Sequence, residues 1–351
     1  MKTKSSNRIV AYWIFIGVAM LIIQVLLGGI TRLTGSGLSI TEWKPIMGAL
    51  PPLNETEWQK AFEQYQHIAQ FKYINSHFNL ADFKFIFFWE WFHRLWARFI
   101  GVVFLIPFIY FIIKKYFQQW MIMPLIVLFI MGALQGAIGW IMVKSGLNDE
   151  DVYVSHIKLA IHFVAAMVLI GYALIFGLKI IIPAEQRIEN NSFKKFTIAI
   201  IVLLVIQLFY GAFMAGLKAA KIAPTWPSIN GNFFPTNTHD YSLVNNLFFN
   251  PLIIHFIHRG IAYILFILIL VWWWQSKKII TSSVFNTLKV FPVVLVIVQV
   301  LLGIFSLLTS PQIVIGHFGI FEWMAQLHQL TGMLLLLALV TNLYIVGLKN
   351  N

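Results

Sequence analysis

The sequence predicts an all-α integral membrane protein in which eight transmembrane helices form two parallel-repeat four-helix bundles. Of its 351 residues, 59% are hydrophobic and only 11% are charged, whereas a soluble domain has about 25% charged residues. Apolar runs recur that are long enough to cross a hydrocarbon core, which takes about 20 residues. Two short polar motifs also return in alternate apolar segments, and this alternation indicates a repeat.

Eight apolar segments are expected to span the membrane. Their approximate bounds are residues 10–30, 85–113, 120–143, 155–180, 194–217, 250–275, 287–309 and 320–347. The second and the eighth are long enough to tilt or to project beyond the bilayer. The loops at 31–84 and 218–249 are rich in Trp, Phe and Pro, so we expect ordered caps over the bundle with Trp at the membrane interface.

The basic residues indicate membrane topology. The chain has a formal net charge of +12, but Lys and Arg lie mostly in short segments between the apolar runs. This distribution sets orientation in a lipid bilayer and predicts that both termini are cytoplasmic. Because no soluble domain carries a basic patch with interleaved aromatics, we do not expect nucleic acid to be a partner.

The chain has no cysteine. Disulfides, thiolate metal sites and covalent c-type haem attachment are therefore excluded. The short basic segment 1–8 precedes an apolar run without a small-residue cleavage site, so the first helix is expected to stay uncleaved. The segment also lacks the Arg- and Ser-rich character of a mitochondrial import signal, and the bacterial cytoplasmic (inner) membrane is the expected location.

Two motifs alternate along the predicted helices. Odd-numbered helices carry Gln-x-x-x-Gly near the outer end, at Gln24–Gly28, Gln135–Gly139, Gln207–Gly211 and Gln299–Gly303. Even-numbered helices carry a histidine followed four residues later by Ala or Gly, at His93, His162, His258 and His328. Duplication of a four-helix unit explains both motifs and predicts an N-terminal half at 1–183 and a C-terminal half at 184–351. Taken alone, the glutamine motif favours close helix packing.

The four histidines are candidate haem ligands. A polar residue in hydrocarbon is costly and needs a partner or a function. Interhelical hydrogen bonds would explain one such histidine, but four at equivalent positions favour axial ligation of haem iron. Histidines on facing helices of a four-helix unit can ligate one porphyrin, which predicts the pairs His93 with His162 and His258 with His328. Structural zinc sites usually have four N or S ligands close together, so zinc fits less well.

The two halves differ beside the histidines. Glu90 stands three residues before His93, and His255 stands three residues before His258. Positions three apart share a helix face, so Glu90 is expected to face the same space as His93. A carboxylate there can accept a proton or stabilise positive charge. The first half is therefore the predicted reaction site, and the second is a predicted fixed cofactor site. The alternative explanation for Glu90 is an ion pair with Arg94 or Arg98.

Three arginines follow the candidate ligands, at Arg94, Arg98 and Arg259. Arginine matches a carboxylate bidentately, so these residues are candidate partners for haem propionates, and snorkelling to the interface explains them equally well. The other histidines in or beside the outer loops are expected to be solvated surface. These are His67, His77, His156, His239 and His317. A place at a haem edge stays open for His156 and His317, as does the role of His255.

Six stretches carry a resemblance to a known family: GGITRLTGSGLSITEWKPIMGALPPL (28–53), EWFHRLWARFIG (90–101), HIKLAIHF (156–163), TWPSING (225–231), NPLIIHFIHRGIAY (250–263) and QLHQLTG (326–332). Through them the chain resembles the haem A synthases of proteobacteria and mitochondria over nearly its full length. The first and fifth stretches are highly specific in combination. The His-x-x-x-Ala pieces would be weak alone.

The resemblance implies an oxidoreductase that converts the C8 methyl group of haem O to a formyl group by successive hydroxylations with water-derived oxygen. It implies a haem b cofactor on His258 and His328, substrate haem O on His93 and His162, and a catalytic role for Glu90. Some relatives carry a cysteine pair in the outer loops, which this chain lacks. Pathway order suggests a haem O synthase as partner. The electron acceptor and the oligomeric state, a homo-oligomer included, stay open.

The alternative function is a cytochrome b-like di-haem subunit of a quinol oxidoreductase. Such an electron-transfer protein should treat its two sites alike, and the difference between Glu90 and His255 argues against it. A transporter built on a repeat ranks third. Transporters often have broken helices and polar residues at the membrane midplane, whereas the polar residues here cluster toward the outer ends of the helices.

Overall fold

The computed structural model describes residues 2–42, 47–235, 242–279, 282–313 and 318–347. Within these ranges the chain is helical and has no strand, only an isolated bridge between Ile229 and Asn232. The α-helices are α1 (Lys2–Leu33), α2 (Glu55–Gln66), α3 (Leu80–Ile113), α4 (Gln119–Lys144), α5 (His156–Ile181), α6 (Asn191–Gly216), α7 (Leu243–Phe249), α8 (Pro251–Ser276), α9 (Ser283–Leu288), α10 (Phe291–Thr309) and α11 (Ile320–Ile345). The predicted all-α fold is confirmed.

Eight helical spans in the described part of the chain are long and apolar enough to cross a membrane. They are α1, α3, α4, α5, α6, α8, the α9–α10 segment and α11. Many large apolar side chains on these helices point outward, such as Ile106 and Ile113 of α3, which are 63% and 70% exposed. A contiguous apolar exterior of this kind suits lipid rather than water, and the predicted set of eight transmembrane helices is confirmed.

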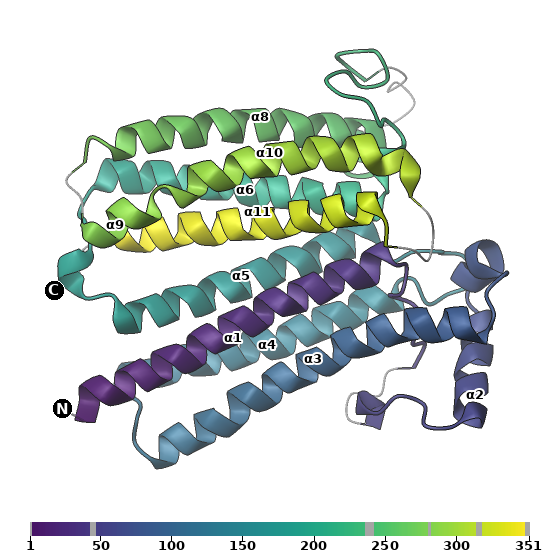
Figure 1. Cartoon of the computed structure of the whole chain (residues 1–351), viewed down its shortest axis with the longest axis horizontal. Coiled ribbons are helices and arrows are strands. Elements are labelled where there is room, and N and C mark those ends of the chain that lie inside the picture. The colour runs from purple at the N-terminus through teal and green to yellow at the C-terminus, as the bar shows by residue number, and fades with distance from the viewer. Residues whose placement is uncertain (1, 43–46, 236–241, 280–281, 314–317, 348–351) are drawn as a thin grey trace.

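The helices lie in two neighbouring groups (Figure 1). One group holds α6, α8, α10 and α11, and the other holds α1, α3, α4 and α5. The groups meet where α5 contacts α6 and α11, and where α1 contacts α11. The division into halves at 1–183 and 184–351, and their origin by duplication, remain predictions. Both termini lie at one end of the bundle, and α2 lies at the opposite end.

Local capping sets where helices begin. The side chain of Asn79 accepts hydrogen bonds from the N–H groups of Ala81 and Asp82, and Asp82 returns a bond to the Asn79 backbone. This capping box starts α3 five residues before the predicted apolar segment. The side chain of Asn250 caps α8 by accepting hydrogen bonds from the N–H groups of Leu252 and Ile253. Pro251 lies in the first turn, where its missing N–H costs nothing.

The loops between α1 and α3 and between α6 and α8 are called the first and second outer loops, after their predicted side of the membrane. The first is held against α3 by an aromatic cluster. Phe62 and Tyr65 of α2 are buried against Phe83 of α3, with ring centroids 5.2 and 5.4 Å from that of Phe83. Such aromatic pairs contribute beyond their buried area, by about 0.5–1.5 kcal/mol each. The cluster fastens α2 to the N-terminal part of α3, the helix that also carries Glu90. Of the loop residues that suggested this cap, Trp43 and Pro45 lie outside the described residues.

Candidate functional site

The four repeated histidines lie on the four even-numbered spans. His93 is on α3, His162 on α5, His258 on α8 and His328 on α11, and all four are half-buried. The imidazole centroids of His258 and His328 are 6.4 Å apart, with an angle of 75° between the rings. Two imidazoles on opposite sides of one metal ion have centroids about 6 Å apart, because each metal–nitrogen bond is about 2.0–2.1 Å. The second pair therefore fits one iron between its rings.

Each of these rings lies against the glycine of a Gln-x-x-x-Gly motif on a neighbouring helix. In each case a Cβ atom added to the glycine would come close to a ring atom of the histidine. The distances are 3.3 Å for Gly28 and His93, 2.8 Å for Gly139 and His162, 3.2 Å for Gly211 and His258, and 2.9 Å for Gly303 and His328. At Gly139 and Gly303 the ring would have to shift to admit a Cβ atom, and at Gly28 and Gly211 the contact would be tight. The sequence favoured close helix packing for this motif, and the packing partner is the histidine itself.

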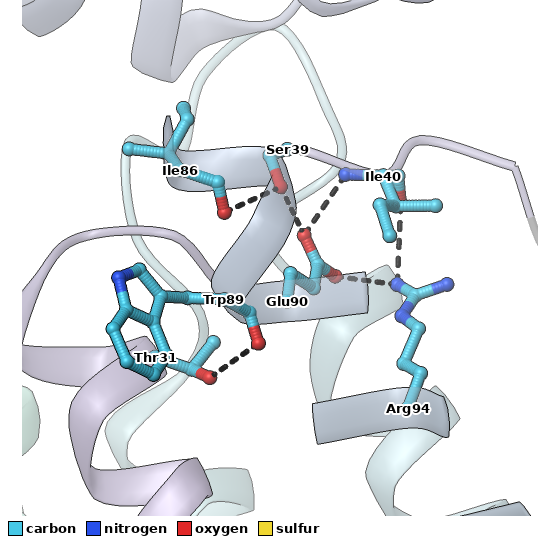
Figure 2. A network of polar contacts seen from close by, with 7 residues as sticks. All are labelled: Thr31, Ser39, Ile40, Ile86, Trp89, Glu90 and Arg94. Atoms are coloured by element: carbon cyan, nitrogen blue, oxygen red, sulfur yellow. Dashed lines mark hydrogen bonds and ion pairs between the residues drawn. The ribbon is translucent and has the colours of Figure 1, made fainter. Parts of the chain in front are cut away.

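Glu90 sits in a network of polar contacts between α3 and the first outer loop (Figure 2). It is 2% exposed. Its Oε2 accepts hydrogen bonds from the Ser39 hydroxyl at 2.7 Å and the Ile40 N–H at 2.9 Å, and its Oε1 lies 2.6 Å from Nη2 of Arg94. Arg94 also donates to the Ile40 carbonyl at 3.2 Å. The ion pair considered from the sequence is therefore present, and two loop donors, missed from the sequence, complete it.

The second half repeats this arrangement with different chemistry. Arg259, one turn after His255 on α8, donates from Nε to His255 Nε2 at 3.0 Å. Its other N–H groups donate to carbonyls of the second outer loop, which belong to Ala223, Thr225, Pro227 and Ser228. With the bond to His255, Arg259 makes five contacts, as many as a guanidinium has N–H groups. A propionate at Arg259 would have to replace one of them.

The remaining predicted residues fall in separate places. Arg98 lies on α3, one turn beyond Arg94. His67 and His77 are exposed, as expected. The ring of His156 contacts the Phe248 carbonyl at 2.7 Å and so links α5 to α7. His239 and His317 lie outside the described residues.

The fold and these contacts define a class: a multi-pass membrane protein with four half-buried histidines at repeated positions, each ring lying against a glycine of a neighbouring helix. In the described part of the chain no group of three or more His, Cys, Asp or Glu side chains could hold a metal ion. Two histidines per site remain the predicted donor set, which would suit an iron whose other ligands come from a porphyrin.

Comparison with known proteins assigns the family. The family described as "Cytochrome oxidase assembly protein" matches residues 11–340. A "Heme A synthase" of Flavobacterium johnsoniae is 38% identical over 350 residues, covering 97% of this chain and 98% of the relative. That of Novosphingobium aromaticivorans is 36% identical over 364 residues, covering 99% of this chain and 97% of the relative. That of Bartonella henselae is 38% identical over 315 residues, covering 89% of this chain and 88% of the relative. The chain belongs to the haem A synthase family, whose members are enzymes of haem biosynthesis.

Proposed function

We propose that this protein is a haem A synthase that oxidises the C8 methyl group of haem O to a formyl group. Two successive hydroxylations pass through the hydroxymethyl compound, and oxygen comes from water. The second hydroxylation gives a gem-diol that loses one water, so one water per methyl group balances the reaction. Four protons are released, and four electrons pass to an external electron acceptor. The site must therefore hold a substrate edge beside a proton acceptor and near an outlet for electrons.

The observation that supports this proposal is the residue three positions before the first repeated histidine of each half, which is a buried carboxylate in the first half and a buried imidazole in the second. Glu90 lies three residues before His93 and is 2% exposed, while His255 fills the equivalent place before His258. A carboxylate next to the reacting group can take up protons as they leave. Two loop donors orient it and Arg94 balances its charge. The first half then suits chemistry and the second suits a fixed cofactor.

In this proposal His93 and His162 hold the iron of haem O and orient the macrocycle. The 6.4 Å spacing of the His258 and His328 rings fits haem b, which when bound supplies a one-electron carrier for the oxidation. Arg94, Arg98 and Arg259 remain candidates to neutralise propionates. Glu90 accepts protons at its carboxylate, and the loop above it limits the access of bulk water.

We further propose the bacterial inner membrane as the location, with both termini cytoplasmic, because the basic residues of the short loops lie on the side of the termini. Substrate would arrive from a haem O synthase in the same membrane. Reporter fusions at either terminus should give cytoplasmic signals. A periplasmic signal from either fusion would overturn this orientation.

The deciding experiment co-expresses the chain with a haem O synthase in a host that makes no haem A but keeps its own respiratory chain. Haems are extracted from membranes with acidic acetone and separated by chromatography with mass detection. A haem A or hydroxymethyl peak that depends on this chain would support the proposal. Bound haem b with haem O left unconverted would overturn it and favour the di-haem electron-transfer alternative.

A further inference from the structure

Arg32 is a cation without a counter-charge near the outer end of α1. It stands in the last turn of this helix and is half-buried. Its guanidinium makes no hydrogen bond or ion pair within the described part of the chain. An arginine at this depth of a membrane protein is costly, and it normally pairs with an acid or with backbone carbonyls. The absence of such a partner points to a ligand that supplies the anion.

The helix face that carries Arg32 is directed into the protein. Gly29 and Gly28, three and four residues earlier, lie against Gln326 of α11 and His93 of α3. A helix advances about 100° per residue, so the Arg32 side chain leaves α1 between the directions of these two glycines. The same helix also contacts α5 where the two helix groups meet (Figure 1). Snorkelling toward lipid headgroups therefore fits this arginine less well than an internal ligand does.

The repeat shows that this charge is specific to one site. In each helix with a Gln-x-x-x-Gly motif, one residue stands four positions after the glycine. These residues are Arg32, Val143, Ala215 and Leu307. Helix packing needs no charge at this position, because the other three helices have an apolar residue there. Since Gly28 lies against His93, the cation belongs to the first histidine pair.

Two other arginines beside the histidines already have partners. Arg94 forms an ion pair with Glu90. Arg259 donates hydrogen bonds to His255 and to carbonyls of the second outer loop. A carboxylate that arrived at either arginine would compete with these contacts. At Arg32 it would displace no contact with a described residue.

A second cation lies near Arg32. Lys218 follows α6 and places its ammonium 3.6 Å from the Tyr153 ring centroid, close enough to Arg32 for the two charges to repel. Neither Lys218 nor the neighbouring Lys221 forms an ion pair with an acid of the described chain. Positive charge from both helix groups is thus gathered at the outer end of their contact, and such a field attracts an anion.

We propose that Arg32 binds a propionate carboxylate of the haem held by the first histidine pair. Lys218 strengthens the positive field there. Haem carries two propionates, and a guanidinium matches a carboxylate with two parallel hydrogen bonds. An anchor of this kind fixes the rotation of the macrocycle about its iron, which decides the edge that is presented to Glu90. The inference rests on the proposed function only in taking His93 and His162 as haem ligands.

A ligand with blocked carboxylates tests this contact. The probes are ferric protoporphyrin IX and its dimethyl ester, each added to purified full-length protein, and the change in Soret absorption gives the dissociation constant. His93→Ala identifies the part of the signal that comes from the first pair. Esterification should weaken binding to the unmodified protein by about 10-fold to 100-fold, the contribution of a hydrogen bond to a charged group.

The same comparison on Arg32 variants isolates the pair of partners, as a double-mutant cycle does. In Arg32→Met the esterification penalty should be about 10-fold smaller than in the unmodified protein, because the partner of the carboxylate is gone. Arg32→Lys keeps the charge without the fork and should give an intermediate penalty. Arg8→Met is the matched control, since Arg8 is exposed at the opposite end of the same helix and its loss should leave both dissociation constants unchanged.

Three results would overturn the inference. The first is equal affinity of the unmodified protein for the two probes, an outcome that requires no variant to fold. The second is the same esterification penalty in Arg32→Met as in the unmodified protein. The third is unchanged affinity for ferric protoporphyrin IX in Arg32→Met together with the loss of a co-purified anionic phospholipid, because the anion would then be a lipid headgroup.

Binding is measured without turnover, so the inference and the proposed function fail separately. A chain that shows the expected penalties but leaves haem O unconverted would keep the inference and remove the proposed function. A chain that makes haem A and binds both probes equally would do the reverse. Binding that does not depend on His93 at all would overturn the inference.

Discussion

Glu90 and His255 occupy equivalent positions 165 residues apart, and each binds the arginine one turn further along its helix. In both halves that arginine also ties the helix to carbonyls of the outer loop above it. The hydrogen-bond arrangement is thus alike in both halves, while the charge at this position differs: the first half buries a carboxylate with its arginine, and the second buries an imidazole. His255 Nδ1 is buried and has no partner among the described residues.

The first prediction concerns Glu90. Glu90→Ala and Glu90→Gln remove the carboxylate, and both variants should keep their haems while haem A output falls by about 100-fold or more, the usual contribution of a general acid or base. Extracted haems, normalised to protein, measure this. Glu322→Gln is the control, because Glu322 is equally buried but caps α11 through the Gly319 N–H. Normal output from Glu90→Gln would mean that Glu90 only fastens the loop.

The second prediction concerns the cofactor pair. His258→Ala and His328→Ala each remove one of the two rings that lie 6.4 Å apart, so purified protein should lose most of its haem b. The pyridine haemochrome spectrum per mole of protein measures the loss. His67→Ala, an exposed change on the outer loop, should leave the haem content intact. Full haem b in both variants would refute the assignment of these ligands.

The spans were predictable because their cause is local. A run of apolar residues must be long enough to cross the bilayer, and that length is visible in the sequence. The differences lie at the ends, where polar chemistry takes over. The capping box at Asn79 starts α3 early, and the segment expected at 287–309 is divided into α9 and α10, with Pro292 in the first turn of α10. Both signals are present in the sequence.

The partners of the site residues were not predictable in the same way. Helical spacing places Glu90 on the face of His93, but Ser39 and Ile40 lie about 50 residues upstream in a loop whose path no periodicity describes. The glutamine motif was visible as a repeat, yet its meaning depends on which helix faces which. That relation is set by the packing of the whole bundle. Sequence therefore located the candidate site residues and missed the groups that orient them.

The third prediction concerns the arginine of the second half. Arg259→Lys keeps the charge but cannot reproduce the fork that reaches several loop carbonyls and His255 at once. Each hydrogen bond from a charged group contributes about 1.5–3 kcal/mol, so the loop at 222–232 should open more readily. Hydrogen exchange measured by mass spectrometry should show faster exchange there and no change in α2. Unchanged protection of the loop would show that its other contacts suffice.

The fourth prediction concerns pH and Lys218, which follows α6 with a left-handed φ of 52° and places its ammonium 3.6 Å from the Tyr153 ring centroid. Partial burial, then the nearby cations Lys221 and Arg32, lower the pKa of Lys218 to about 8 from its usual 10.5. Because the folded pKa is the lower one, the unfolded chain binds more protons between these values, and folding stability rises with pH across that window.

Lys218→Met should remove this rise, and it should raise stability at neutral pH, where charging the lysine opposes folding. Apparent unfolding temperatures in detergent from pH 7 to 10 test both effects. Lys60→Met, an exposed change on α2, serves as the control and should keep the pH profile of the unmodified protein. Identical profiles for the Lys218 and Lys60 variants would assign the pH response to other groups.

The last prediction concerns the contact between the two helix groups. Gly29 of α1 lies against the side-chain amide of Gln326 on α11, and that amide donates to the Leu26 carbonyl at 3.1 Å. Gly29→Ala would push the buried amide off this acceptor and should destabilise the fold by about 1–3 kcal/mol, as overpacking does. Gly17 lies on the same helix, and a Cβ atom there would have nothing within 4 Å, so Gly17→Ala should stabilise by about 0.5–1 kcal/mol through helix propensity. Opposite shifts of the unfolding temperature in detergent are expected, and shifts of the same sign and size would show that the amide moves aside without cost.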